Sequence, residues 1–206
     1  ALFLALQSMG WHVPVAVVAV DLVTAHAGWF VPGAEAYLVP TPGAKERAVR
    51  WGNAPDRVHV TGMPIRRPFL AAMDLSRSEA RTRVGLPHDG AVVLIVGGGE
   101  GMGPLAQVVR AIANQRPSAH IVVITGRNAA LHEDLTRMPL PIPVQVEGFV
   151  DNMDVWMRAA DVLVTKAGPN TLAEAFIAGL PLVLYTALPG QEQGNVELVV
   201  RHDAGV

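Results

Sequence analysis

Seven short runs of apolar residues recur along the chain, and they restrict it to one class of fold. The runs occupy residues 15–20, 36–39, 92–96, 121–125, 144–146, 162–165 and 182–185. Each run is continuous rather than alternating between apolar and polar residues, which is typical of strands buried on both faces of a parallel sheet. The segments between them carry helix signals. The pattern therefore predicts an α/β protein with parallel sheets.

Residues that begin or end helices stand between the runs. Thr41 precedes Pro42 at the start of a helix expected to end near Gly52, and Pro104 is expected to open a helix after a glycine loop. Asp151 is expected to cap a helix that continues to Ala160, and the segment from Gly179 to Pro181 stops another. A further strand is expected to begin at residues 204–206.

The composition changes between Gly62 and Gly90, where prolines and charges gather around one modest helix. We therefore predict the latter part of a first α/β domain over residues 1–68, a linker over 69–90 and a second domain over 91–206. Both ends of the sequence interrupt a structural pattern, so the sequence is interpreted as an internal fragment of a longer protein.

Charge and cysteine content exclude several classes of function. The chain has 206 residues, with 16 basic against 18 acidic side chains, which gives no footprint for nucleic acid. No cysteine is present, so disulfides and cysteine-based metal or redox sites are excluded. The longest apolar run, residues 13–20, is far shorter than the roughly 20 residues of a membrane-spanning helix. With no signal peptide recognisable, a cytoplasmic location is expected.

Residues 160–195 predict an anion site beside groups that bind hydroxyls. A buried strand is followed by a turn and a helix, the arrangement in which free backbone N–H groups face a phosphate. Carboxylates and amides nearby suit the hydroxyls of a nucleotide-sugar. The residues of the turn are Gly168, Pro169, Asn170 and Thr171, and the hydroxyl-binding candidates are Glu174, Gln191, Glu192 and Asn195.

A glycine loop follows the strand at residues 92–96. Its candidate donor-binding residues are Gly97, Gly98, Gly99, Glu100 and Gly101. Backbone N–H groups in such a loop can approach a pyrophosphate closely. The loop is not the dinucleotide fingerprint, because the third glycine position falls on Met102, and no Gly-Lys-Ser/Thr follows as in a P-loop. A tight turn without a ligand is the alternative.

Two further loops follow predicted strands. The backbone of Phe149 and Val150 can pair with the edge of a base, although a plain strand-to-helix connection is equally compatible. Asp21 and His26 follow the first strand and are candidate acid and base groups, against the alternative of structural roles. Trp29 and Phe30 are either core residues or an apolar lip that meets lipid.

Taken together, these motifs resemble those of the diacylglycerol glycosyltransferases, the group that contains the monogalactosyldiacylglycerol synthases. This group is related to the peptidoglycan lipid-linked N-acetylglucosaminyl transferase. The resemblance covers almost the whole chain and follows the family's order. The shared segments are DLVTAHAGWF, PTPGAKERAVRWG, VHVTGMPIRRPF, GGGEGMG, GFVDNM, TKAGPNTLAEA, GLPLVL and PGQEQGN.

The resemblance implies the GT-B fold, with two Rossmann-like domains, of which the first is incomplete here. It implies an inverting transferase that moves galactose or glucose from UDP-galactose or UDP-glucose to diacylglycerol at a membrane surface. Carried over, the Phe149-Val150 backbone would meet uracil and Glu174 the ribose. Gly168 to Thr171 and the glycine loop would hold the diphosphate, and Gln191, Glu192 and Asn195 would grip the sugar. No metal cofactor is expected, and no Asp-x-Asp triplet occurs.

The sequence departs from the family in one respect. The family's N-terminal glycine-rich loop, with a histidine near the acceptor, is missing, so the general base can lie outside this sequence rather than at His26 or Asp21. Two rival functions stay open. One is a UDP-sugar 2-epimerase of the same architecture, and the other is a UDP-binding fragment without activity of its own.

Overall fold

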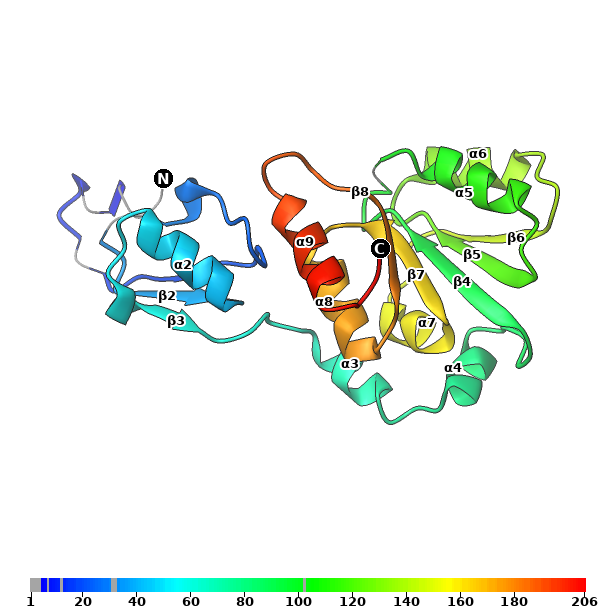
Figure 1. Ribbon diagram of the computed structural model, residues 1–206, viewed down its shortest axis with the longest axis horizontal. Coiled ribbons are helices and arrows are strands. Elements are labelled where there is room, and N and C mark those ends of the chain that lie inside the picture. The colour runs from blue at the N-terminus through cyan, green and yellow to red at the C-terminus, as the bar shows by residue number, and fades with distance from the viewer. Residues whose placement is uncertain (1–4, 7, 12, 31–32, 102) are drawn as a thin grey trace. The chain divides into compact units, whose positions relative to one another are not determined.

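The computed structural model describes residues 5–6, 8–11, 13–30, 33–101 and 103–206 (Figure 1). Met102 of the glycine loop lies outside these ranges. The chain forms two compact units, residues 1–64 with 188–195 and residues 65–187 with 196–206. Each unit contains a parallel sheet, so the predicted α/β class is confirmed.

The first unit contains a three-stranded parallel sheet in the order β1-β2-β3. Its strands are β1 (Ala16–Val18), β2 (Ala36–Val39) and β3 (Val58–Val60). Short 3-10 helices, η1 (Ala27–Trp29) and η2 (Pro55–Arg57), lie in the connections. Helix α2 (Pro42–Arg50) begins where predicted, because the Thr41 side chain accepts a hydrogen bond from the Ala44 N–H. β3 was not predicted, since it has only three residues and His59 stands in its middle.

The second unit contains a five-stranded parallel sheet in the order β6-β5-β4-β7-β8. The strands are β4 (Ala91–Val96), β5 (Ala119–Ile124), β6 (Val144–Glu147), β7 (Val162–Lys166) and β8 (Leu182–Thr186). All five coincide with predicted apolar runs. Residues 204–206 also pair in parallel with β8, through a bridge between Leu182 and Gly205, where a further strand was expected.

Successive residues of a strand point to opposite faces of the sheet, so each face of the second sheet presents side chains that helices can cover. On one face, Ile95, Ile121 and Val123 pack against α5 (Leu105–Asn114) and α6 (Ala129–Arg137). Four other helices pack against one another and form a second layer: α3 (Arg67–Ala72), α4 (Arg77–Arg83), α7 (Met153–Ala159) and α8 (Pro169–Ala178). The last helix is α9 (Gln193–Arg201).

The segment predicted as a linker, residues 69–90, groups with the second unit. Arg81 on α4 explains this grouping, because its side chain is only 5% exposed and binds Asp161, the residue directly before β7. Its guanidinium pairs with Asp161 at 2.7 Å and donates to the carbonyls of Ala159, His88 and Gly90. Contacts between residues so far apart in sequence leave no local composition signal.

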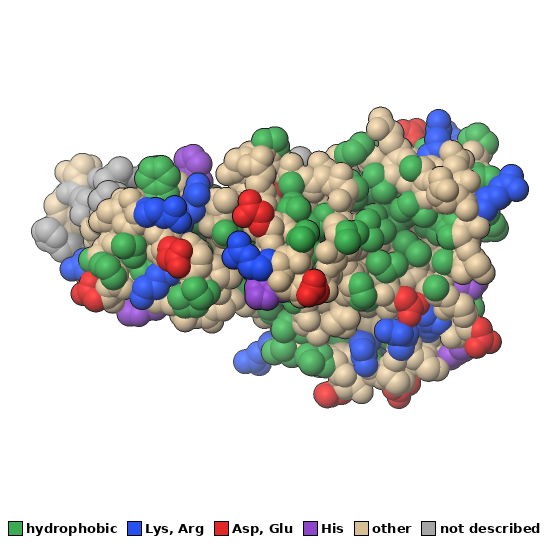
Figure 2. All heavy atoms as spheres, viewed as in Figure 1, with side chains coloured by type: hydrophobic (Ala, Val, Ile, Leu, Met, Phe, Trp, Pro, Cys, Tyr) green, Lys and Arg blue, Asp and Glu red, His purple; other side chains and the backbone are tan. Residues whose placement is uncertain are grey.

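Apolar side chains also gather at the surface. In Figure 2 hydrophobic side chains form a patch on the visible face of the second unit, with charged side chains at its margins. In the first unit, Trp11, Trp29 and Trp51 are each more than half exposed. No helix formed by the described residues combines the length and hydrophobicity needed to cross a bilayer.

Candidate functional site

A pocket of about 160 Å³ lies in the second unit, where β4, β5, β6 and β7 end. The chain turns to opposite sides of β4 to form β5 and β7, and ligands of open α/β sheets bind at such a switch point. Six predicted donor-binding residues are among its lining residues. The lining residues are Arg66, Val96, Gly98, Gly99, Ile124, Gly126, Phe149, Val150, Met153, Met157, Thr171 and Glu174.

The glycine loop after β4 packs closely against the loop after β5. A Cβ on Gly101 would lie 2.4 Å from the Thr125 carbonyl oxygen, and one on Gly126 would lie 2.3 Å from the Gly99 carbonyl oxygen. Both glycines also have positive φ, at 56° and 63°. Part of the glycine content therefore serves the packing of two loops, while Gly98 and Gly99 line the pocket.

The amino end of α8 supplies the predicted anion-binding turn. Gly168 is the N-cap and Pro169 the first helical residue, so the N–H groups of Asn170 and Thr171 have no acceptor within the helix. Thr171 lines the pocket. Just before this turn the pairing of β7 with β8 shifts register at Thr165/Lys166. The Lys166 side chain lies against the glycine loop, since a Cβ on Gly98 would be 3.7 Å from its Cε.

Glu174 lies in the second turn of α8, and its side chain is 15% exposed. Arg66, which precedes α3, forms an ion pair with it, with 3.2 Å between Nη2 and Oε1. Burial raises the pKa of the Glu174 carboxyl group above its ordinary value, and the Arg66 guanidinium opposes that rise. The pocket therefore holds a largely desolvated carboxylate with a cation beside it.

Arg66 was missed by the sequence reasoning. It lies in the proline-rich stretch that was predicted to lead into a linker, far from Glu174 in sequence. The signal that could have identified it is the pair Arg66-Arg67 directly before Pro68, where two adjacent cations occupy the N-cap and first position of a helix. That signal does not say which carboxylate the arginine would meet.

Phe149 stands at the rim of the pocket and is 56% exposed. The Arg127 guanidinium lies over its ring, with Cζ 4.3 Å from the ring centroid. Arg127 also pairs with Glu100 of the glycine loop, with 3.3 Å between Nη1 and Oε1. The Glu100 side chain, which is 66% exposed, therefore joins the glycine loop to Arg127 through an ion pair.

The two acid–base candidates lie in the first unit. Asp21 is 3% exposed, and its Oδ2 accepts a hydrogen bond of 2.8 Å from the Trp29 indole. His26 is exposed and caps η1, with its Nδ1 accepting from the Gly28 N–H at 3.0 Å. In the neutral imidazole this hydrogen bond places the proton on Nε2.

The predicted sugar-binding residues group with the first unit. The Gln191 side chain donates from Nε2 to Asp21 Oδ1 at 3.2 Å. The backbone carbonyl of Gln191 accepts from the Thr24 hydroxyl. Glu192 is buried and accepts from the Leu188 N–H at 2.9 Å, while Asn195 is fully buried. These residues therefore lie with Asp21 rather than among the lining residues of the pocket.

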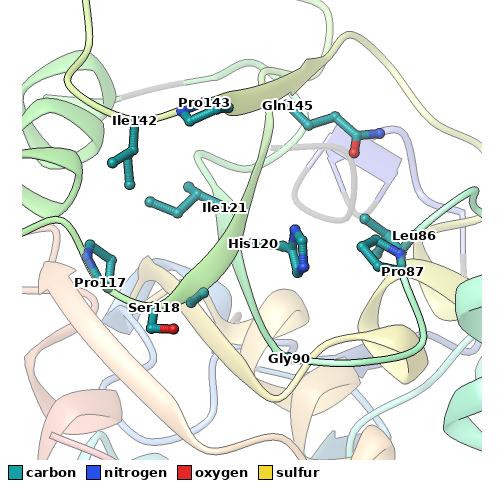
Figure 3. A pocket seen from close by; sticks show the side chains of 11 residues that line it. Leu86, Pro87, Gly90, Pro117, Ser118, His120, Ile121, Ile142, Pro143 and Gln145 are labelled. Atoms are coloured by element: carbon teal, nitrogen blue, oxygen red, sulfur yellow. The ribbon is translucent and has the colours of Figure 1, made fainter.

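Another cavity, of about 550 Å³, lies at the opposite ends of the strands of the second sheet (Figure 3). It is formed near the amino ends of β5 and β6, and its walls are mostly prolines and aliphatic side chains with His120 and Gln145 between them. None of the predicted site residues lies there. Within the described ranges, no cluster of three or more His, Cys, Asp or Glu side chains could hold a metal ion.

Both units of the chain match models of known protein families. Residues 92–205 match the glycosyltransferase family 28 C-terminal domain, and residues 3–65 match the monogalactosyldiacylglycerol (MGDG) synthase family. The chain is 42% identical over 207 aligned residues to a probable monogalactosyldiacylglycerol synthase 2, chloroplastic, of Oryza sativa subsp. japonica. That alignment covers 97% of this chain and 44% of the relative, so the chain spans less than half of the relative's length.

Solved structures share the fold at low sequence identity. A UDP-GlcNAc 2-epimerase from Neisseria meningitidis bound to UDP-GlcNAc has a TM-score of 0.67 at 16% identity, over 98% of this chain and 65% of that chain. WaaG, a glycosyltransferase involved in lipopolysaccharide biosynthesis, has a TM-score of 0.62 at 16% identity, over 100% and 66% of the two chains. The two-unit GT-B architecture is therefore shared by enzymes of different activity.

Proposed function

Because this chain belongs to glycosyltransferase family 28 and resembles the monogalactosyldiacylglycerol synthases, we propose that it forms the donor site of a lipid glycosyltransferase. In the proposed reaction a UDP-sugar, UDP-galactose or UDP-glucose, gives its hexose to diacylglycerol. The relatives' name favours galactose. The observation that carries the proposal is the pocket at the carboxyl ends of β4 to β7, which unites predicted residues from three segments: the glycine loop, the loop after β6 and the first turns of α8.

The nucleotide is proposed to lie along this pocket. The Phe149-Val150 backbone would meet the edge of uracil, and the Glu174 carboxylate would accept hydrogen bonds from the ribose hydroxyls. The diphosphate would lie between the glycine loop and the turn from Gly168 to Thr171. Arg66 is proposed to keep Glu174 ionised inside the pocket.

Backbone N–H groups at the α8 amino end and in the glycine loop are suited to the leaving group. In the proposed step an oxygen of diacylglycerol loses its proton and attacks the anomeric carbon on the side opposite to the diphosphate. The new C–O bond forms while the bond to the diphosphate oxygen breaks, so the configuration inverts and UDP departs. N–H groups fixed in advance stabilise the charge that grows on UDP. No metal is required in this proposal.

The first unit is proposed to serve the sugar and the acceptor. Gln191, Glu192 and Asn195 would bind the hexose, and Asp21 and His26 stay the candidates for proton transfer. Both already accept hydrogen bonds, His26 Nδ1 from the Gly28 N–H and the Asp21 oxygens from Trp29 and Gln191. The exposed Trp11, Trp29 and Trp51 are proposed to meet the membrane surface, since tryptophan favours the membrane–water interface.

Binding of UDP to variants of Glu174 tests the donor site. Calorimetry with UDP should show a dissociation constant about ten- to 100-fold higher for Glu174→Ala, because a carboxylate that accepts two hydrogen bonds is lost. Glu133→Ala is the matched control, since Glu133 is exposed on α6 of the same unit and also pairs with an arginine. Equal UDP affinity of wild type and Glu174→Ala would contradict the assignment.

An activity assay separates the transferase from its rivals. The complete parent protein would be incubated with each UDP-hexose, with and without diacylglycerol, and the products identified by mass. A hexosyl-diacylglycerol supports the transferase. A change in the UDP-sugar without lipid would instead indicate a 2-epimerase, an activity found in the Neisseria meningitidis enzyme of the same fold. UDP binding without turnover of any kind would indicate a binding module.

A further inference from the structure

Arg127 contacts two walls of the donor pocket although it is not one of the pocket's lining residues. It follows β5, which lies between β4 and β6 in the sheet. On one side its backbone N–H donates to the Gly99 carbonyl at 2.8 Å, and its Nη1 lies 3.3 Å from Glu100 Oε1. On the other side its guanidinium lies over the Phe149 ring.

These contacts join the loops that follow three neighbouring strands. The glycine loop follows β4, Arg127 follows β5 and Phe149 follows β6. Phe149 and Glu100 are both more than half exposed, so packing alone holds neither side chain in place. A planar guanidinium suits both contacts at once, because its face attracts an aromatic ring and its edge donates to a carboxylate.

We infer that Arg127 is a positioning residue of the donor pocket, which fixes Phe149 and the glycine loop at the spacing that a uridine diphosphate requires. The inference rests on the proposed function, since it names a residue that acts at the same site. Arg127 acts through its two neighbours rather than on the reacting atoms. Its loss should therefore weaken nucleotide binding without changing the fold.

Calorimetry with UDP on the 206-residue chain tests this role. Arg127→Ala should raise the dissociation constant about fivefold to tenfold, as expected when an exposed cation–π contact and an ion pair are lost together. Arg127→Lys should recover little of that loss, since an ammonium keeps the charge but not the planar face. The control is Arg137→Ala, which removes an exposed arginine paired with Glu133 on α6 of the same unit and should leave UDP affinity unchanged.

A double-variant cycle distinguishes positioning from direct contact. If Arg127 acts through Phe149, the combined variant Arg127→Ala/Phe149→Ala should bind UDP clearly better than the product of the two single losses predicts. Losses that multiply would overturn the positioning role, and so would wild-type affinity in Arg127→Ala. Absence of UDP binding by the wild-type chain would refute the proposed function instead, so the two failures are distinguishable.

Discussion

Replacing Arg81 with methionine should destabilise the second unit far more than replacing its neighbour Arg77. Both guanidinium groups bind the same carboxylate: Arg81 lies 2.7 Å from Asp161 Oδ2, and Arg77 lies 2.8 Å from Asp161 Oδ1. Their exposure differs, because the Arg81 side chain is 5% exposed and that of Arg77 is 52% exposed. Methionine keeps most of the length and volume of the side chain and removes the charge and the donors.

The magnitude follows from what the Arg81 substitution leaves behind. The carbonyls of Ala159, His88 and Gly90 each lose a charged donor within 3.1 Å. Asp161 keeps Arg77 as a partner, so the cost comes from these carbonyls, at about 1–3 kcal/mol for each buried acceptor left without a donor, and we expect about 3–5 kcal/mol of unfolding free energy in all. Loss of an exposed partner costs less than about 1 kcal/mol, which we expect for Arg77→Met.

Hydrogen exchange measured by mass spectrometry is the suitable assay, since it reports each unit separately. Amides of β4 and β7 should exchange faster in Arg81→Met, and the melting temperature of the second unit should fall by about 10 °C. Peptides of β2 in the first unit should exchange as in the wild type. A loss in Arg81→Met no greater than that in Arg77→Met would refute the argument from burial.

Two further predictions concern the pocket. Gly126→Ala should weaken UDP binding strongly, because its Cβ would lie 2.3 Å from the Gly99 carbonyl, whereas Gly179→Ala has a similar φ with open space around it and should keep UDP affinity. UDP affinity should also fall as the pH falls through the raised pKa of Glu174, because protonation removes an acceptor for the ribose. Arg66→Ala should move this loss to higher pH, since Arg66 lowers that pKa. Calorimetry across a pH series checks both, and a pH profile of Arg66→Ala identical to that of the wild type would contradict the second.

All strands except β3 could be predicted from the sequence because each is a continuous apolar run, and the inner strands β4, β5 and β7 are largely buried. All seven predicted runs form strands, and α2 and α8 begin or end at the expected Thr41 and Gly179. The predicted cap at Asp151 was wrong by one residue, since Asn152 is the N-cap of α7. Such boundary errors reflect competing polar residues in one short loop.

The relations between distant side chains could not be predicted. The sequence suggested a pocket with Glu174 and the glycine loop, and the second unit brings these together. Arg66 and Arg127 escaped notice because their partners are set by the packing of loops rather than by spacing along the chain. The hydrogen bonds that Asp21 accepts from Trp29 and Gln191 also depend on the packing of loops.

The strand order has a consequence for how the second unit folds. β4, β5 and β6 follow one another along the chain, whereas β7 must return past β5 and β6 to pair with β4, as in the pairing of Val93 with Val162. Closing that long loop costs chain entropy before the pairing stabilises it, so β7, α8 and β8 should join late. A folding intermediate with only β4 to β6 formed would hold the Phe149 wall without Thr171 and Glu174. We therefore expect UDP to slow unfolding without accelerating the early steps of folding.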